Sequence, residues 1–237
     1  MIAGVTICKN EAGIVGLSLR HHFAEGVNRI YVADAHSTDG TRDIFAEIIT
    51  EGHDLIVIDD DEPFVHQDTL TNSLIERAGS DGATWILPFD CDEFFYATNG
   101  DSLATVLEDC PHNVLCARSW QHKDFNIRQA SPKRLPKVVF RHSPSARVSW
   151  GNHEVSIADP GVWGIVDLRE IQFQSYEHFC QKVKDRNAVV SPEDRAKGYG
   201  IHHARLDGAS HETMRAEWDG MWTDVVTDPI PTQIAHP

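Results

Sequence analysis

The first ninety residues alternate short apolar runs with amphipathic segments, and this alternation constrains the fold more than any other feature. The apolar runs cover residues 3–8, 29–34, 54–59 and 84–89, and the segments between them cover 11–26, 42–52 and 67–79. Each intervening segment carries apolar residues at helical spacing, as with Val15, Leu19 and Phe23. Strands that alternate with helices pair in parallel and are covered by helices on both faces. We therefore predict an α/β fold with a mostly parallel central sheet.

Polar residues follow each of these predicted strands. In open α/β sheets, ligands bind beyond the carboxyl ends of the strands. That rule selects Lys9–Glu11, Asp34–Thr41, Asp59–Asp61 and Asp90–Glu93, three of which carry clustered acids. We expect these four segments to form the ligand-binding edge.

The second half of the chain is richer in strands. Residues 113–120, 137–142, 147–157 and 166–174 have the pattern of strands with no regular helix between them. An amphipathic helix is expected over 175–190, where Tyr176, Phe179 and Val183 share one face. From Ser191 onward, Gly, Pro, His and charged residues predict loops with short helices.

Composition excludes several classes of function. The formal net charge is −15, with 36 acidic and 21 basic residues, which argues against nucleic acid or an anionic membrane as a partner. The five cysteines form no C-x-x-C pair, so reduced thiols are expected rather than disulfides or a zinc–thiolate site. No apolar run is long enough for a transmembrane segment, and no signal peptide begins the chain. We expect a cytoplasmic protein; a peripheral membrane association would leave no mark on this sequence.

The segment Asp90-Cys91-Asp92-Glu93 places three carboxylates directly after the fourth predicted strand. Asp90 and Asp92 are one residue apart, so both side chains can point to the same side. Two phenylalanines follow as predicted core residues and hold the acids against the interior. Carboxylates this close repel each other unless a positive group lies between them, and Mg²⁺ or Mn²⁺ prefers such oxygen ligands. Because these ions usually complete their shell with substrate phosphates, the motif predicts a phosphorylated substrate such as a diphosphate.

The nucleotide-binding motifs of other folds are missing. No G-x-G-x-x-G follows the first predicted strand, where the chain reads VTICKNEAGIVG, and no G-x-x-x-x-G-K-[ST] is present. Dinucleotide binding is therefore disfavoured and P-loop phosphate binding is excluded. What remains is a metal-bridged diphosphate on an α/β sheet.

The segments VTICKNE, RIYVADAHSTDGT and WILPFDCDEFF together resemble the GT-A glycosyltransferases, in particular the family-2-like branch with a D-x-D-E-F signature. The likeness extends through Gln67, WGNHEV and SYEHFCQKV and covers most of the chain. It implies a single GT-A domain with a Rossmann-like sheet. Residues 1–115 would bind the nucleotide sugar, and residues 116–237 would form a β-rich acceptor-side half with a C-terminal tail.

The resemblance also implies roles for individual residues. The implied donor-binding residues are Lys9, Asn10, Glu11, Asp34, Gln67 and Asp90. Asp90 and Asp92 match the D-x-D, with Asp92 as the direct metal ligand and Asp90 as a metal ligand or a sugar contact. His153 would complete the metal shell or contact the diphosphate. The Mn²⁺ or Mg²⁺ ion would neutralise charge on the departing nucleoside diphosphate.

Three acids are candidates for the catalytic base, which must take the proton of the acceptor hydroxyl in an inverting transfer. Asp124 lies in the segment SWQHKDFN, where acceptor contacts are expected, although an exposed loop acid would look the same. Glu154 follows His153 on a predicted strand, so its side chain would point to the opposite face. Glu93 is the third, with an alternative role in orienting the metal site.

The chain departs from the family pattern before the last predicted helix. Relatives tend to carry a His and an Arg-Ser there, whereas EIQFQSYEHF places Glu170 and Gln174 in those positions. An arginine there would clamp the diphosphate, so Lys182, Arg186 and a residue of the C-terminal tail are candidate substitutes.

Three functions stay open at this point. The leading hypothesis is a metal-dependent transferase that moves a sugar, with UDP-sugar as the expected donor, to a hydroxyl on a glycan or other acceptor. A sugar nucleotidyltransferase shares the sheet and the metal chemistry, but it normally has a glycine- and base-rich loop where this chain has only Lys9. A degenerate glycan-binding module is the third, and Glu170 and Gln174 are its only support.

Overall fold

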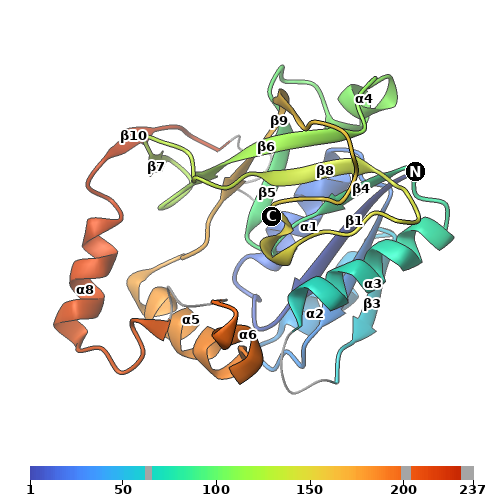
Figure 1. Cartoon of the computed structure of the whole chain (residues 1–237). Coiled ribbons are helices and arrows are strands. Elements are labelled where there is room, and N and C mark those ends of the chain that lie inside the picture. The colour runs from blue at the N-terminus through green and yellow to red at the C-terminus, as the bar shows by residue number, and fades with distance from the viewer. Residues whose placement is uncertain (62–65, 199–203, 231–237) are drawn as a thin grey trace.

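The computed structural model describes residues 1–61, 66–198 and 204–230, and within them an eight-stranded sheet forms the centre of the molecule (Figure 1). Its strands are β1 (Ile2–Cys8), β2 (Arg29–Asp34), β3 (Leu55–Asp59), β4 (Trp85–Pro88), β5 (Glu93–Ala97), β6 (Val114–Gln121), β8 (Lys137–Arg141) and β9 (Val162–Glu170). They lie in the order β3-β2-β1-β4-β8-β6-β9-β5. The sheet is mixed and mostly parallel, which confirms the predicted α/β fold.

The first four strands of the chain are parallel and form one side of the sheet. Their register aligns Cys8 with Asp34, and Asp34 with Asp59. The segments after β1, β2 and β3 therefore lie side by side at the carboxyl edge, as the sequence predicts. Close packing also requires Gly4, because a Cβ there would lie 2.9 Å from the ring of Phe89.

Helices cover both faces of this parallel side. These are α1 (Val15–Ala24), α2 (Thr41–Thr50) and α3 (Gln67–Ser80). Leu19 of α1 and Phe45 of α2 pack in one core with Val32, whereas Leu74 of α3 packs in a second core with Val5. The two cores lie on opposite faces because successive strand residues point to opposite sides.

The other side of the sheet contains β8, β6, β9 and β5. β4 and β8 are antiparallel, as are β6 with β8 and β5 with β9, whereas β6 and β9 are parallel. The acidic segment leads directly into β5, which pairs Glu93 with Glu170. Phe94 and Phe95 are fully buried, as predicted for the residues that follow the acids. A short helix, α4 (Leu103–Glu108), begins at Ser102, whose side chain accepts a hydrogen bond from the amide of Thr105.

The predicted strand over 147–157 is wrong. The segment forms a 3-10 turn, η1 (Trp150–Asn152), and only an isolated bridge between Val148 and Val155 is extended. Gly151 and Asn152 both have positive φ, at 78° and 59°, which interrupts an extended strand. The strand predicted over 166–174 is shifted and runs from Val162 to Glu170.

The C-terminal segment packs against the edge of this body. It contains α5 (Tyr176–Val189), α6 (Pro192–Ala196) and α8 (His211–Gly220), followed by β10 (Val225–Thr227), which pairs with β7 (Ile127–Gln129). An aromatic cluster with Phe179 of α5 and Trp218 of α8 joins the two helices. Both lie on the side of the carboxyl edge in Figure 1. No helix within the described ranges is long and apolar enough to cross a membrane.

Candidate functional site

The acidic turn between β4 and β5 lies at the centre of the candidate site. The amide of Glu93 donates to Asp90 O at 2.9 Å, and the amide of Asp90 donates to Glu93 Oε2 at 2.9 Å, so these two residues close the turn. Asp92 and Glu93 are buried, and Asp90 is half-buried. The sequence predicts one cation between Asp90 and Asp92, but in the structure each of these carboxylates binds a different lysine.

Lys137, the first residue of β8, neutralises one part of the turn. Its Nζ lies 2.8 Å from Asp90 Oδ2 and 2.9 Å from Glu93 Oε1, and its side chain is 6% exposed. Burial lowers the pKa of Lys137, but the charges of Asp90 and Glu93 outweigh burial and raise that pKa above its usual value. Burial raises the pKa of Glu93 to about 8, although the charge of Lys137 opposes this shift. Burial and the charge of Lys137 therefore act on Glu93 in opposite directions, and Lys137 contacts both carboxyl groups.

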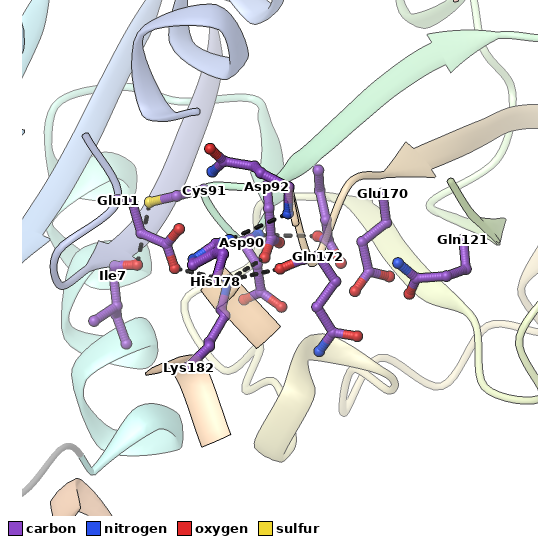
Figure 2. Close-up of polar contacts among 12 residues, drawn as sticks. Ile7, Glu11, Asp90, Cys91, Asp92, Gln121, Glu170, Gln172, His178 and Lys182 are labelled. Atoms are coloured by element: carbon purple, nitrogen blue, oxygen red, sulfur yellow. Dashed lines mark hydrogen bonds and ion pairs between the residues drawn. The ribbon is translucent and has the colours of Figure 1, made fainter. Parts of the chain in front are cut away.

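Lys182 of α5 neutralises the other part (Figure 2). Its Nζ lies 2.6 Å from Asp92 Oδ2, 2.8 Å from Glu11 Oε1 and 3.3 Å from Gln172 O. The side chains of Lys182 and Asp92 are 7% and 4% exposed. One ammonium thus connects the end of β1, the acidic turn and α5. His178, one turn earlier on α5, is half-buried, and burial lowers its pKa despite the nearby charge of Asp92.

The loop after β1 is bound to the loop after β2. Asn10 Oδ1 accepts from the amide of Thr38 at 2.8 Å, and the amide of Asn10 donates to Ser37 Oγ at 2.9 Å. The amide of Glu11 donates to Thr41 Oγ1 at 3.0 Å. Asn10 and Glu11 therefore lie at the predicted ligand edge and are held in place by the STDGT segment, whereas neighbouring Lys9 is exposed.

Asp34 lies beneath a pocket at the end of β2. Its carboxylate is fully buried and accepts from Arg42 Nε at 2.5 Å and from the amide of Ser37 at 3.3 Å. Arg42 also binds Asp59 at the end of β3. The pocket has a volume of about 400 Å³ and is lined by His36, Ser37, Thr38, Arg42, Asp59 and Asp61. Sequence reasoning missed Arg42, which lines this pocket. The only indication of it in the sequence is a basic residue directly after STDGT.

His153 follows η1 and is fixed from two sides. Its Nδ1 lies 2.6 Å from Pro136 O, and a Cβ on Gly151 would lie 2.5 Å from its Nε2. Burial lowers the pKa of His153, and the charges of Lys137 and Asp90 also act on it. The predicted metal ligand is thus a neutral imidazole in the electrostatic neighbourhood of Asp90. Gln67 is half-buried at the first position of α3.

The acidic side chains of this site suit a hard divalent cation only in combination with phosphate oxygens. In the part of the chain that the structure describes, no three His, Cys, Asp or Glu side chains are grouped to hold an ion. Mg²⁺ commonly binds through one or two carboxylates together with substrate phosphates, and Asp90 and Asp92 supply such oxygens. The ammonium of Lys182 already occupies a cation position between Glu11 and Asp92. The residues therefore fit the ion if Lys182 releases Asp92.

The three candidate bases lie in different surroundings. Asp124 is exposed on the loop after β6, where its Oδ1 accepts from the amides of Asn126 and Ile127 at 2.8 and 3.0 Å. Glu154 is exposed just after η1, so the alternation argument that placed it on a strand does not apply. Glu93 is buried within the acidic turn.

The two departures from the family pattern have separate environments. Glu170 is buried, with Lys133 Nζ 2.6 Å from its Oε1, and its Oε2 accepts from Ser119 Oγ at 3.0 Å. Gln174 is exposed and lies against Gly13, where a Cβ would come within 2.3 Å of its Oε1. Of the candidate substitutes, Lys182 lies among the acids, and the side chain of Arg186 lies outside the part that the structure describes.

Comparisons with known proteins give one family match and several structural similarities. A family model described as Glycosyl transferase family 2 matches residues 5–167. No match is found among the curated proteins. The structure of S. aureus TarS residues 1–349 in complex with UDP is 11% identical, covers 90% of this chain and 73% of that chain, and gives a TM-score of 0.46. The mannosyltransferase PcManGT from Pyrobaculum calidifontis, in complex with GDP-Man and Mn²⁺, is 13% identical, covers 92% and 78%, and gives a TM-score of 0.46.

The similar TarS chains are longer than this one. The chain covers 46%, 66%, 73% and 39% of the four similar TarS chains. The family model, by contrast, extends over well over half of this chain, from β1 into β9. The protein therefore belongs to glycosyl transferase family 2.

Proposed function

We propose that this family 2 enzyme transfers a sugar from a nucleoside-diphosphate donor to a hydroxyl acceptor with the help of Mn²⁺ or Mg²⁺, and that UDP-sugar is the donor. The observation that carries the proposal is the cluster of Glu11, Asp92 and Lys182 at the carboxyl edge of the sheet. This is the edge at which α/β sheets bind their ligands. It also holds the pocket bounded by Arg42 and Asp59.

The two parts of the donor, its nucleoside and its diphosphate, would bind at two neighbouring places. The pocket after β2 and β3 would take the nucleoside, with Arg42 held against the buried Asp34 as its fixed wall. The diphosphate would lie over the acidic turn, where Asp90 and Asp92 would hold the divalent cation. When bound, that cation supplies charge neutralisation for the departing nucleoside diphosphate. Lys137 holds the turn in place through its ion pairs with Asp90 and Glu93.

The acceptor would approach from the side of β6 and β9. Asp124 and Glu154 are exposed and can meet a hydroxyl group, so they remain the proposed bases for an inverting transfer. Glu93 is fully buried, which suits it to holding the turn rather than to contact with an acceptor. His153 would contact the cation or the diphosphate.

Binding and turnover of nucleotide sugars test this proposal directly. Thermal unfolding is measured with UDP, GDP, CDP and TDP, each with and without Mn²⁺, and release of the nucleoside diphosphate is then measured with the matching sugar donors. We expect a cation-dependent stabilisation by UDP, and a loss of turnover of about 100-fold in Asp92→Asn, because the variant lacks the charge that holds the cation. Asp109→Asn, an exposed acid after α4, is the matched control.

Three outcomes would point elsewhere. Unchanged turnover in Asp92→Asn would rule out a cation held by this residue. Release of pyrophosphate from a nucleoside triphosphate would favour nucleotidyl transfer. Glycan binding without any dependence on nucleotide or cation would favour the binding-module alternative.

A further inference from the structure

The ammonium of Lys182 and a divalent cation would compete for the carboxylate of Asp92. Lys182 Nζ lies 2.6 Å from Asp92 Oδ2 and 2.8 Å from Glu11 Oε1. Two positive charges at such separations repel each other strongly in a buried site. A cation bound at Asp92 and a lysine bound at Asp92 are therefore alternative states of one site.

Lys182 is also able to leave this position. It is carried by α5, which lies outside the sheet and packs on α8 through an aromatic cluster (Figure 1). A lysine has a flexible four-carbon stem, so its ammonium can change partner while the helix stays in place. Its carbonyl contact, Gln172 O at 3.3 Å, is the longest of the three distances and the only uncharged one.

A displaced Lys182 would need a new anionic partner, because a charge taken from its partners in a buried site is costly. Glu11 is still beside it once the cation has taken Asp92, but Glu11 alone cannot replace the lost charge of Asp92. The oxygens of a diphosphate bound over the turn can, since lysine binds phosphate as a point charge.

We propose that Lys182 is the resident counter-ion of the donor site, and that it moves from Asp92 to the diphosphate when donor and cation bind together. The proposal rests on the proposed function and adds that binding of the cation depends on binding of the nucleotide. Without nucleotide, Lys182 blocks the cation position; with nucleotide, it becomes a phosphate-binding residue. Cation and nucleotide must then increase each other's affinity by the same factor.

Mn²⁺ binding to the nucleotide-free protein tests this without any assay of sugar transfer. Free Mn²⁺ is measured by electron paramagnetic resonance in titrations of the wild type, Lys182→Met and Lys184→Met. Lys184 lies exposed on the same helix and provides the same change of charge, which controls for long-range electrostatics. We expect Lys182→Met to bind Mn²⁺ about tenfold more tightly than wild type, within the usual range of coupling between sites, and Lys184→Met to match wild type.

Addition of UDP completes the test. In the wild type we expect UDP to tighten Mn²⁺ binding by about tenfold, and in Lys182→Met by much less, because the block is already removed. Equal or weaker Mn²⁺ binding by Lys182→Met than by wild type would overturn the proposal. If the variant does not fold, as judged by circular dichroism, the wild type alone decides: Mn²⁺ binding that is equally tight with and without nucleotide would also overturn it.

The outcomes separate this inference from the proposed function. If Lys182→Met gains Mn²⁺ affinity but no nucleotide alters Mn²⁺ binding in any of the proteins, Lys182 does block the cation position, but its move to a diphosphate and the donor proposal both fail. If nucleotide and Mn²⁺ bind together but Lys182→Met gains nothing, the transferase proposal holds and the counter-ion role fails.

Discussion

Two buried lysines neutralise the same four-residue turn, but the chain anchors them very differently. Lys137 begins β8, which lies between β4 and β6 inside the sheet. Lys182 belongs to α5, which meets the sheet only at its carboxyl edge. Their side chains are almost equally buried, at 6% and 7% exposure. Burial alone therefore does not distinguish the two lysines, whereas the element that carries each of them does.

The largest effect is expected for Lys137→Met. This change leaves Asp90 without its counter-charge beside the buried Glu93. Loss of one partner from a buried pair typically costs about 3–5 kcal/mol, and we expect a loss in that range in the free energy of unfolding measured with urea. Lys197→Met is the control, since Lys197 forms an exposed pair with Glu193 and such pairs contribute up to ~1 kcal/mol. A loss for Lys137→Met no larger than this control would contradict the structural role.

A smaller effect is expected for Lys182→Met, and it should be reversible by metal. The carboxylates of Asp92 and Glu11 lose their ammonium, but a divalent cation can replace it. Ligand at a hundredfold excess over its Kd stabilises the folded state by ~2.7 kcal/mol, so Mn²⁺ should restore much of the lost stability. The same Mn²⁺ concentration should not restore Lys137→Met. Equal rescue of both variants would remove the distinction between the two lysines.

The third expected effect concerns pH. The pKa of Glu93 rises from 4.5 to about 8 on folding because of burial. A raised carboxyl pKa means that the folded state binds the proton more tightly, so this group's contribution to stability is present at acid pH and is lost as pH rises through about 8. Glu93→Gln should therefore lose less stability than wild type between pH 5 and pH 8, measured by urea unfolding at each pH. The exposed Glu108→Gln should show the same pH dependence of stability as the wild type. If the unfolding free energies of Glu93→Gln and the wild type change in parallel with pH, the raised pKa of Glu93 would be contradicted.

The parallel side of the sheet was readable from the sequence because its signals are local. The strand predicted over 29–34 is found at Arg29–Asp34, and the acidic segment after the fourth strand lies at the expected edge. The charge of Asp90 and Asp92 led to the prediction of a cation between them. In the structure these acids contact Lys137 and Lys182, which are separated from them by 47 and 90 residues. Periodicity carries no information about contacts over such distances.

The second half was harder to predict because its strands depend on irregular backbone. The run over 147–157 has the composition of a strand, yet positive φ at Gly151 and Asn152 makes it a turn. β9 contains Gly164 with φ of 83° and nevertheless continues to Glu170. The difference depends on which neighbours pair with the segment, and β9 has both β6 and β5 beside it.

The contact of Lys182 with Glu11 has a consequence for where the working unit of this enzyme ends. The family match stops at residue 167, within the last strand of the sheet, and suggests a natural boundary there. Yet Lys182, fifteen residues further along, reaches back to Glu11 in the first loop of the chain. A protein cut at that boundary would lose the end of β9 together with the lysine that lies between Glu11 and Asp92. Exchange of C-terminal segments between related enzymes would then alter how they handle metal, even though every residue of the recognised motif stayed the same.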